Sequence, residues 1–428
     1  MGLLLEHGTL VTQDAQRRVL RGNLRLDGGR IAALGPEVRR ERGDEVLDCT
    51  GRLVLPGLVN LHTHTPMTLL RGVGDDLPLE RWLQERIWPL EAKLTAEAVR
   101  AGSDLALLEL LTSGTTAFND MYFWPEETAQ AAVQASIRAW LGHPILDFPT
   151  PDLPAERHLP ESEAFLQRWR GNALVTPTVQ PHATYTCGPA RLEAAAKLAE
   201  RFAAPFHTHC SETRTEVYDV EKQHGARPVE LLRRHGALGP RTILAHCGWI
   251  TKEEVRTLAR AGAKVAHCPV SNLKLGTGGF TPLPELLAEG AGVGLGTDGA
   301  ASNNTLDLFE TMKLTALVHK HHRWDPTVIP AQVALDLATR GGAEALGRSD
   351  LGRLEPGAAA DVVVLDARTP RMQPLHDPVS QVVYAARGTD VEHVVVNGRL
   401  VVRERRCLTL DAEQVVARAV GAAQRLAG

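Results

Sequence analysis

A repeat of short apolar runs, each followed by an amphipathic stretch, constrains the fold of this chain more than any other feature. It extends from about residue 58 to about residue 350; for example, TPTVQPH precedes PARLEAAAKLAERF, TILAHC precedes KEEVRTLARAG and GVGLGTDG precedes LDLFETMKLTALVHK. Such runs are typical of buried strands, and the segments after them have helical periodicity. The number of units predicts an α/β protein with a closed (β/α)8 TIM-like barrel rather than an open parallel sheet.

Both ends of the chain have β character instead. LLLEHGTLVT near the start and VEHVVVNGRLVVRERR near the end alternate apolar and polar residues between turn signals. Neither end alone has much core to bury, so we expect residues 1–57 and 351–428 to form one small discontinuous β-sandwich domain that carries a terminal helix, and residues 58–350 to form the barrel. Two separate small β units are the alternative.

The composition argues against several classes of partner. The 428 residues are 43% hydrophobic with a net charge of -4, and no run of Lys or Arg is long enough to follow a phosphate backbone, so a small molecule is expected rather than a nucleic acid. No apolar stretch approaches a membrane span, and MGLLLEHGTLVTQD lacks the basic leader of a signal peptide. The six cysteines have no CxxC spacing, which fits a reducing compartment and predicts a cytoplasmic protein.

Polar side chains end several of the expected barrel strands, which is where such barrels form active sites. His62 and His64, in PGLVNLHTH, are two residues apart in a strand and therefore share a face. His209 ends PFHTH, His246 ends TILAH and Asp298 follows GVGLGT. A single histidine in such a position is usually structural, but five such groups are hard to explain by packing. Imidazoles and a carboxylate predict one divalent metal ion, Zn²⁺ in preference to Fe²⁺ or Mn²⁺.

Three further residues lie near the same strand ends. Glu212 comes three residues after His209, where the strand turns into a loop, so its carboxylate could move a proton between an activated water and a leaving nitrogen without binding the metal. His207 and His209 form a second HxH pair. We expect His209 to face the metal, because it lies nearer the carboxyl end, and His207 to hydrogen-bond one layer deeper. His267, in VAHCPVSN, is expected to be a wall residue.

Four motifs together resemble those of one enzyme family. PGLVNLHTHTPMTLLRG, HCSET, HCPVSNLKLGTGG and TDGAASNNTLDLFETMK are similar, in order and spacing, to motifs of the amidohydrolase superfamily. Within it they resemble the 5'-methylthioadenosine/S-adenosylhomocysteine deaminases, which are related to chlorohydrolases and cytosine deaminase-like enzymes. The resemblance covers nearly the whole chain. It implies metal-dependent hydrolytic deamination of 5'-methylthioadenosine, S-adenosylhomocysteine or adenosine to the inosine-type product and ammonia.

The resemblance also implies roles for individual residues. The implied metal ligands are His62, His64, His209 and Asp298. The implied catalytic groups are Glu212 as the proton shuttle, His246 as the residue that polarises water, and Asp298. Binuclear members of the family bridge two metals with a Lys on the fourth strand, whereas ALVTPTVQPHATYT has none, so one ion is expected.

Substrate contacts are implied for Trp82, Glu91, His182 and Glu212, with Glu91 accepting hydrogen bonds from ribose hydroxyls. Without the resemblance, Trp82 and Glu91 belong to an ordinary amphipathic helix.

The chain departs from the family pattern between residues 143 and 170. Family members that hold the amino-acid tail of S-adenosylhomocysteine use an Arg in this region, and here Arg157, Arg168 and Arg170 are available without a motif to choose among them. Arg157 is our first choice. Guanine, a pyrimidine, an s-triazine or a formimino compound are rival substrates, and a noncatalytic scaffold barrel is the rival outside enzymes. The resemblance further implies a homo-oligomer.

Overall fold

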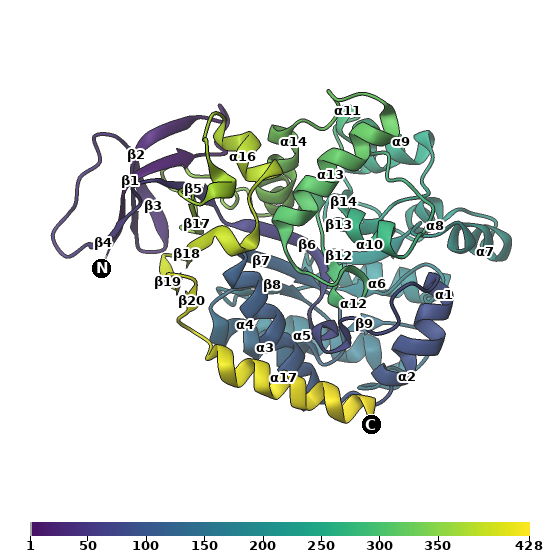
Figure 1. Ribbon diagram of the computed structural model, residues 1–428. Helices are drawn as coiled ribbons and strands as arrows, with labels where there is room; N and C mark the ends of the chain where they lie inside the picture. Colours follow the sequence, from purple (N-terminus) through teal and green to yellow (C-terminus); the bar gives the residue numbers. More distant parts are fainter. Residues whose placement is uncertain (1) are drawn as a thin grey trace.

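The computed structural model describes residues 2–428, and a barrel of parallel strands occupies its centre (Figure 1). One parallel sheet follows the order β10-β8-β7-β6-β16 and a second the order β12-β13-β14-β15. Parallel bridges from Val179 to Phe206 and from Ala183 to His209 join the two sheets on one side, and β16 pairs with β6 to complete the first sheet. The expected (β/α)8 barrel is thereby confirmed.

The barrel strands are β6 (Leu58–His64), β7 (Thr115–Asp120), β8 (Arg138–Leu141), β10 (Val175–Pro177), β12 (Phe206–Cys210), β13 (Thr242–His246), β14 (Lys264–His267), β15 (Gly292–Leu295) and β16 (Asp298–Gly299), with β9 (Pro144–Ile145) paired to β11 (Gln180–Pro181). The helices of the same region are α1 (Leu79–Trp82), the π-helical turn η2 (Leu83–Ile87), α2 (Trp88–Glu91), α3 (Ala96–Thr112), α4 (Pro125–Ala135), α5 (His158–Trp169), α6 (Pro189–Phe202), α7 (Arg214–His224), α8 (Pro228–Arg234), α9 (Lys252–Ala261), α10 (Pro269–Lys274), α11 (Leu283–Ala288), α12 (Ala300–Asn303), α13 (Leu308–Arg323), α14 (Ala331–Asp336) and α15 (Gly342–Ala345).

Helix α9 illustrates why the amphipathic stretches form helices where they do. The Thr251 side chain accepts a hydrogen bond from the backbone of Glu254, and the Glu254 side chain accepts one from the backbone of Thr251, so a capping box begins the helix. Val255 and Leu258, one turn apart, are its buried face. The helix ends at Gly262, which adopts φ 68°, a left-handed conformation that glycine favours.

Both ends of the chain contribute to a single nine-stranded sheet. Its order is β20-β19-β18-β17-β5-β1-β2-β3, with β4 paired to β1, and β17 joins the two ends by pairing antiparallel with β5. This confirms a β domain built from both ends, and two separate β units were the wrong alternative; hydrogen bonds join all nine strands in one sheet. The strands are β1 (Leu3–Val11), β2 (Val19–Asp27), β3 (Arg30–Gly35), β4 (Glu45–Asp48), β5 (Arg52–Pro56), β17 (Val362–Asp366), β18 (Val391–Val396), β19 (Arg399–Arg403) and β20 (Arg406–Cys407).

The terminal helix α17 (Ala412–Ala427) lies along the barrel, beside α3 (Figure 1). Val415, Ala419, Ala422 and Leu426 form its buried face, at helical spacing. Arg418 of this helix contacts Asp104 of α3 at 3.1 Å. The last residues of the chain therefore pack on the barrel rather than on the β sheet. Within residues 2–428, none of the helices combines the length and apolarity needed to cross a bilayer.

Candidate metal and substrate site

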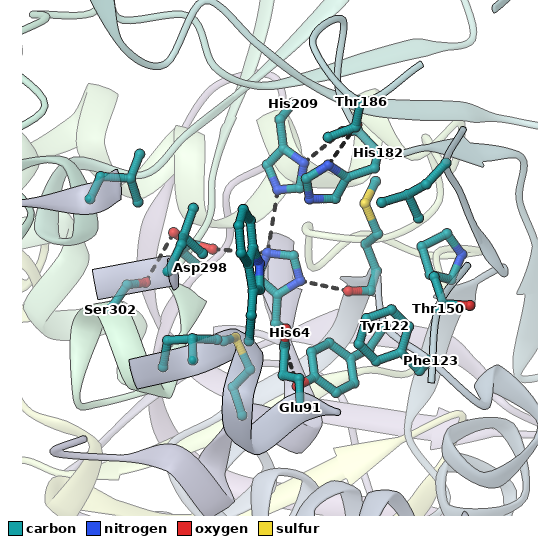
Figure 2. Close-up of a pocket in the computed structure, with 18 of the residues that line it drawn as sticks. His64, Glu91, Tyr122, Phe123, Thr150, His182, Thr186, His209, Asp298 and Ser302 are labelled. Carbon is teal, nitrogen blue, oxygen red and sulfur yellow. Dashed lines mark hydrogen bonds and ion pairs between the residues drawn. The ribbon is translucent and has the colours of Figure 1, made fainter. Parts of the chain in front are cut away.

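Strands β6, β12, β13 and β16 bring the five expected strand-end residues together at one mouth of the barrel. The Nε2 atoms of His62 and His64 lie 3.3 and 3.2 Å from Asp298 Oδ1, and His64 Nε2 lies 3.3 Å from His209 Nε2. Figure 2 shows His64, His209 and Asp298 converging on one point. Two overlapping triplets have their ligand atoms within 4.8 Å of one another; they are His62, His64 and His209, and His62, His246 and Asp298.

The backbone around these residues has left-handed dihedral angles at three positions and a glycine where two strands approach each other closely. Asp298, His246 and Ser211 adopt φ values of 60°, 71° and 51°, in the left-handed region that non-glycine residues rarely visit. Such strained residues cluster at functional sites. At Gly296 an added Cβ would lie 2.9 Å from the Cβ of His62, so a glycine is needed for β15 to lead into β16 beside the metal candidates.

The hydrogen bonds of two imidazoles leave facing lone pairs that a cation would satisfy. His64 Nδ1 donates to the carbonyl of Met121 at 2.6 Å, and His209 Nδ1 donates to the carbonyl of His182 at 2.7 Å. A neutral imidazole that donates through Nδ1 carries a lone pair on Nε2, so the two Nε2 atoms would face each other as acceptors at 3.3 Å. His62 Nε2 is also buried without a hydrogen-bond partner. These donors fit a divalent ion.

The charges of the group point to the same cation. Burial raises the pKa of Asp298, but the neighbouring imidazoles of His62 and His64, 3.3 and 3.2 Å from its Oδ1, outweigh burial and hold this pKa well below its usual range, so the carboxylate is ionised. Burial lowers the pKa of His64, whereas the hydrogen bond and charge of Asp298 outweigh it and raise the pKa to about 9. The cluster therefore attracts one positive charge, which a metal ion can supply in place of the proton on His64.

Two serines bind the other oxygen of Asp298. Ser271 and Ser302 donate their hydroxyl hydrogens to Oδ2 at 2.6 and 3.0 Å. Oδ1, which lies beside the imidazoles, is left for a metal. Burial lowers the pKa of His62 to about 4 and that of His209 well below its usual value, so both rings are neutral at pH 7, the form that binds metals.

Glu212 lies beside this cluster and has the properties of a proton carrier. Its Oε2 is 3.9 Å from His246 Nε2, and burial raises its pKa to about 7. The backbone N–H groups of Ser211 and Glu212 donate to the carboxylate of Glu216 at 3.0 and 2.7 Å, which holds the loop in place. A carboxyl group with a pKa near neutrality can both accept and release a proton at physiological pH.

His246 is oriented by its neighbour Asn272. The Nδ1–H of His246 donates to Asn272 Oδ1 at 2.9 Å, so Nε2 faces the cluster with its lone pair. The carbonyl of His246 accepts a hydrogen bond from Thr281 at 2.9 Å, which supports the left-handed backbone.

A cavity of about 660 Å³ opens above the cluster, a size typical of small-molecule sites. The expected substrate contacts, Trp82, Glu91, His182 and Glu212, all line it. Glu91 is buried and accepts a hydrogen bond from the Tyr122 hydroxyl at 2.7 Å (Figure 2), and burial raises the pKa of its carboxyl group. His182 Nδ1 pairs with the Thr186 hydroxyl at 2.9 Å.

The expectation for Arg157 is wrong. Its guanidinium pairs with Glu161, one turn further along α5, and Arg168 pairs with Glu126 at 2.9 Å. Neither residue lines the cavity, nor does Arg170. Arg157 ends the 3-10 turn Ala155–Arg157 just before α5, and Arg168 lies in the last turn of α5, so both side chains reach the surface.

The two ambiguous histidines lie away from the cavity. His207 Nε2 is 2.9 Å from His62 Nδ1, and His207 Nδ1 donates to the carbonyl of Ile243 at 3.1 Å, one layer deeper in the barrel. His267 Nε2 lies 3.2 Å from His319 Nε2.

Sequence reasoning missed the residues that position the site. Tyr122, Glu216 and Asn272 each orient one expected site residue, yet none ends a strand, and Asn272 was given no role although it lies within the motif HCPVSNLKLGTGG. Their closeness in sequence to a strand end could have identified them, because each lies within six residues after the carboxyl end of a barrel strand.

Comparison with known proteins places the chain in a family. Residues 53–401 match the Amidohydrolase family. The chain is 44% identical over 422 residues to the 5-methylthioadenosine/S-adenosylhomocysteine deaminase of Syntrophobacter fumaroxidans, with 97% of this chain and 96% of the relative covered. It is 42% identical over 413 residues to the 5'-deoxyadenosine deaminase of Methanothermobacter thermautotrophicus, with 96% of each covered. The zinc-bound adenosine deaminase from Xanthomonas campestris superposes with a TM-score of 0.96 at 38% identity, covering 99% of this chain and 98% of that structure. The chain therefore belongs to the amidohydrolase family.

Proposed function

We propose that this protein is a metal-dependent hydrolase that deaminates an adenine nucleoside to the inosine-type product and ammonia. The observation that carries the proposal is the convergence of three imidazoles and an ionised Asp298, beside Glu212, on the floor of a nucleoside-sized cavity. Relatives that are named as deaminases of 5'-methylthioadenosine, S-adenosylhomocysteine and 5'-deoxyadenosine support the same reaction.

One divalent ion would be held by His62, His64, His209 and Asp298. Zn²⁺ is supported by the bound zinc of the Xanthomonas campestris structure, while Fe²⁺ and Mn²⁺ suit the same donors. When bound, such an ion acts as a Lewis acid that makes water a nucleophile near neutral pH.

The residues of the chain would manage the protons of the reaction. Glu212 takes a proton from the attacking water and gives it to the ring nitrogen next to the amino-bearing carbon, while oxygen adds to that carbon. His246, held by Asn272, presents Nε2 to the water and polarises it. In the second half, the remaining hydroxyl proton passes through Glu212 to the amino group, the carbon–nitrogen bond breaks, ammonia leaves and the carbonyl of the product forms.

Three wall residues would hold the nucleoside for this chemistry. Glu91 is placed to accept hydrogen bonds from ribose hydroxyls, because Tyr122 occupies only one of its oxygens. Trp82 supplies an apolar wall, since its indole N–H is already bonded to the carbonyl of Val73 at 3.2 Å. His182, beside His209, lines the cavity above the metal candidates. A buried carboxylate at the ribose position argues against free bases and triazines, which have no hydroxyls to offer.

Ammonia release from a substrate panel tests the function. Zinc-loaded protein is assayed with adenosine, 5'-deoxyadenosine, 5'-methylthioadenosine and S-adenosylhomocysteine, with guanine, cytosine and a triazine as rivals. We expect turnover of at least one adenine nucleoside and none of the rivals. Absence of ammonia from every nucleoside would contradict the proposal, and absence of stoichiometric metal in the purified protein would favour a scaffold barrel. A homo-oligomer and a cytoplasmic location stay predictions, which sedimentation and cell fractionation would test.

A further inference from the structure

The substrate cavity changes character between its floor and its mouth. At the floor, Asp298 is 6% exposed, and Glu91 at mid-depth is 9% exposed. Trp88 and Phe148 also line the cavity but are each 47% exposed. Large aromatic side chains with this exposure lie at the rim, where the outer end of a bound molecule meets solvent.

The wall that surrounds these two aromatic residues is mostly apolar, with Thr150 and Tyr185 as its polar members. Leu79, Leu83, Phe123 and Leu146 line it, together with prolines of the loop at 149 and 151. Among residues 2–428 that line the cavity, none is Arg or Lys. Its acidic liners, Glu91, Glu212 and Asp298, have other roles in the proposed function, which are ribose binding, proton transfer and metal binding. The cavity thus offers an apolar outer end and no permanent cation.

Two basic residues near the loop that carries Phe148 are already paired. Arg191 donates to Asp147 at 2.6 Å and to the carbonyl of Ala155 at 2.9 Å, so it ties down the loop that carries Phe148. Arg157 pairs with Glu161 on the surface. Neither of these two guanidinium groups is therefore free to form the bidentate pair that a carboxylate at the rim would prefer.

We propose that the outer end of the cavity, with Trp88 and Phe148 as its specificity-determining residues, takes an uncharged apolar 5'-substituent and selects against a zwitterionic amino-acid tail. The inference rests on the proposed function, which places the reacting amino group at the metal cluster and the ribose at Glu91, so that the 5' position points to the mouth. An alkyl or alkylthio group gains contact with the two rings. A tail that carries an ammonium and a carboxylate loses part of its hydration to this apolar wall and gains no charged partner from the residues that line it, which is costly.

A matched pair of substrates tests the inference. S-adenosylhomocysteine and 5'-butylthioadenosine have side chains of similar length, but only the first carries charges. We expect kcat/KM for 5'-butylthioadenosine to be close to that for 5'-methylthioadenosine, and kcat/KM for S-adenosylhomocysteine to be at least about tenfold lower. Equal or faster turnover of S-adenosylhomocysteine would overturn the inference.

The inference can be separated from the proposed function. If no nucleoside releases ammonia, the proposed function fails, and calorimetric binding of the same two compounds to the zinc-loaded protein still decides the inference. Tighter binding of 5'-butylthioadenosine supports an apolar outer end, and equal or weaker binding overturns it.

Substitution of Phe148 tests the residue assignment. Phe148→Arg should raise kcat/KM for S-adenosylhomocysteine relative to 5'-butylthioadenosine by about tenfold or more, because it supplies the missing guanidinium. Phe148→Leu, which removes the ring but adds no charge, should leave this ratio within about threefold. If the two variants give the same ratio, Phe148 does not contact the 5'-substituent. Trp88→Ala should lower kcat/KM more for 5'-methylthioadenosine than for 5'-deoxyadenosine, and equal losses would remove Trp88 from the subsite.

Discussion

Tyr122→Phe removes one hydroxyl group from the wall of the substrate cavity and leaves the ring in place. That hydroxyl donates to Glu91 Oε1 at 2.7 Å, and both side chains are buried. The substitution therefore leaves a buried carboxylate short of a donor. Burial already raises the pKa of Glu91 while the bond from Tyr122 opposes that rise, so the variant also shifts Glu91 toward its neutral form.

The expected loss follows from the strength of such a bond. A hydrogen bond to a charged group contributes about 1.5–3 kcal/mol, so kcat/KM should fall by roughly 10- to 150-fold at about 1.4 kcal/mol per factor of ten. The loss of kcat/KM should affect substrates whose ribose hydroxyls bind Glu91. Without the Tyr122 hydroxyl, the Glu91 carboxylate no longer has a fixed position.

The assay compares 5'-deoxyadenosine with 2',3',5'-trideoxyadenosine, which lacks the ribose hydroxyls. We expect a large loss of kcat/KM for the first substrate and a small one for the second. Tyr185→Phe is the control, because Tyr185 lines the same cavity and makes no hydrogen bond to Glu91. Equal losses for the two substrates in Tyr122→Phe would refute a role in ribose binding, and a large drop in melting temperature would assign the hydroxyl to stability instead.

Three further perturbations test other parts of the structure. Glu212→Gln should keep the metal but lower kcat by about 10²- to 10⁴-fold, since an amide cannot carry the proton; full activity at normal metal content would contradict this role. Removal of metal with a chelator should abolish ammonia release and one equivalent of Zn²⁺ should restore it, whereas activity that survives complete removal would exclude the metal site. Burial, then the charges of Arg323 and His322, lower the pKa of His319 to about 3. Because the unfolded state then binds the proton more readily, the stability from neutral His319 is complete above about pH 6.5 and falls by about 2 kcal/mol by pH 5. Urea unfolding at pH 7.5 and 5.0 should show a smaller acid loss in His319→Gln, and equal losses would count against a neutral His319.

The strand-end histidines could be placed from sequence because their geometry is local. Residues that are two apart in a strand share a face, as His62 and His64 do. The position of a residue along an apolar run sets its depth in the barrel, which is why His207 lies below His209. The barrel itself follows from the number of strand–helix units, each of which carries its own periodicity.

Other features depend on contacts between distant segments, which no local pattern records. Tyr122 meets Glu91 only because β7 and α2 end at the same mouth of the barrel. Arg157 was misjudged because the path of the chain just before α5, rather than the number of residues from a strand, decides where the guanidinium lies. The packing of α17 on α3 likewise depends on which apolar face of the barrel is left uncovered.

The pairing of β5 with β17 has a consequence for how the chain is made. Val54 lies opposite Val364, about 300 residues later, so the edge of β5 that does not face β1 has no partner strand while the whole barrel is being synthesised. At about 5–20 residues per second, this edge waits roughly 15–60 s on the ribosome. The backbone N–H and C=O groups along that edge of β5 (Arg52–Pro56) are unpaired meanwhile, so a nascent chain stalled before β17 presents an open strand edge that chaperones would have to shield.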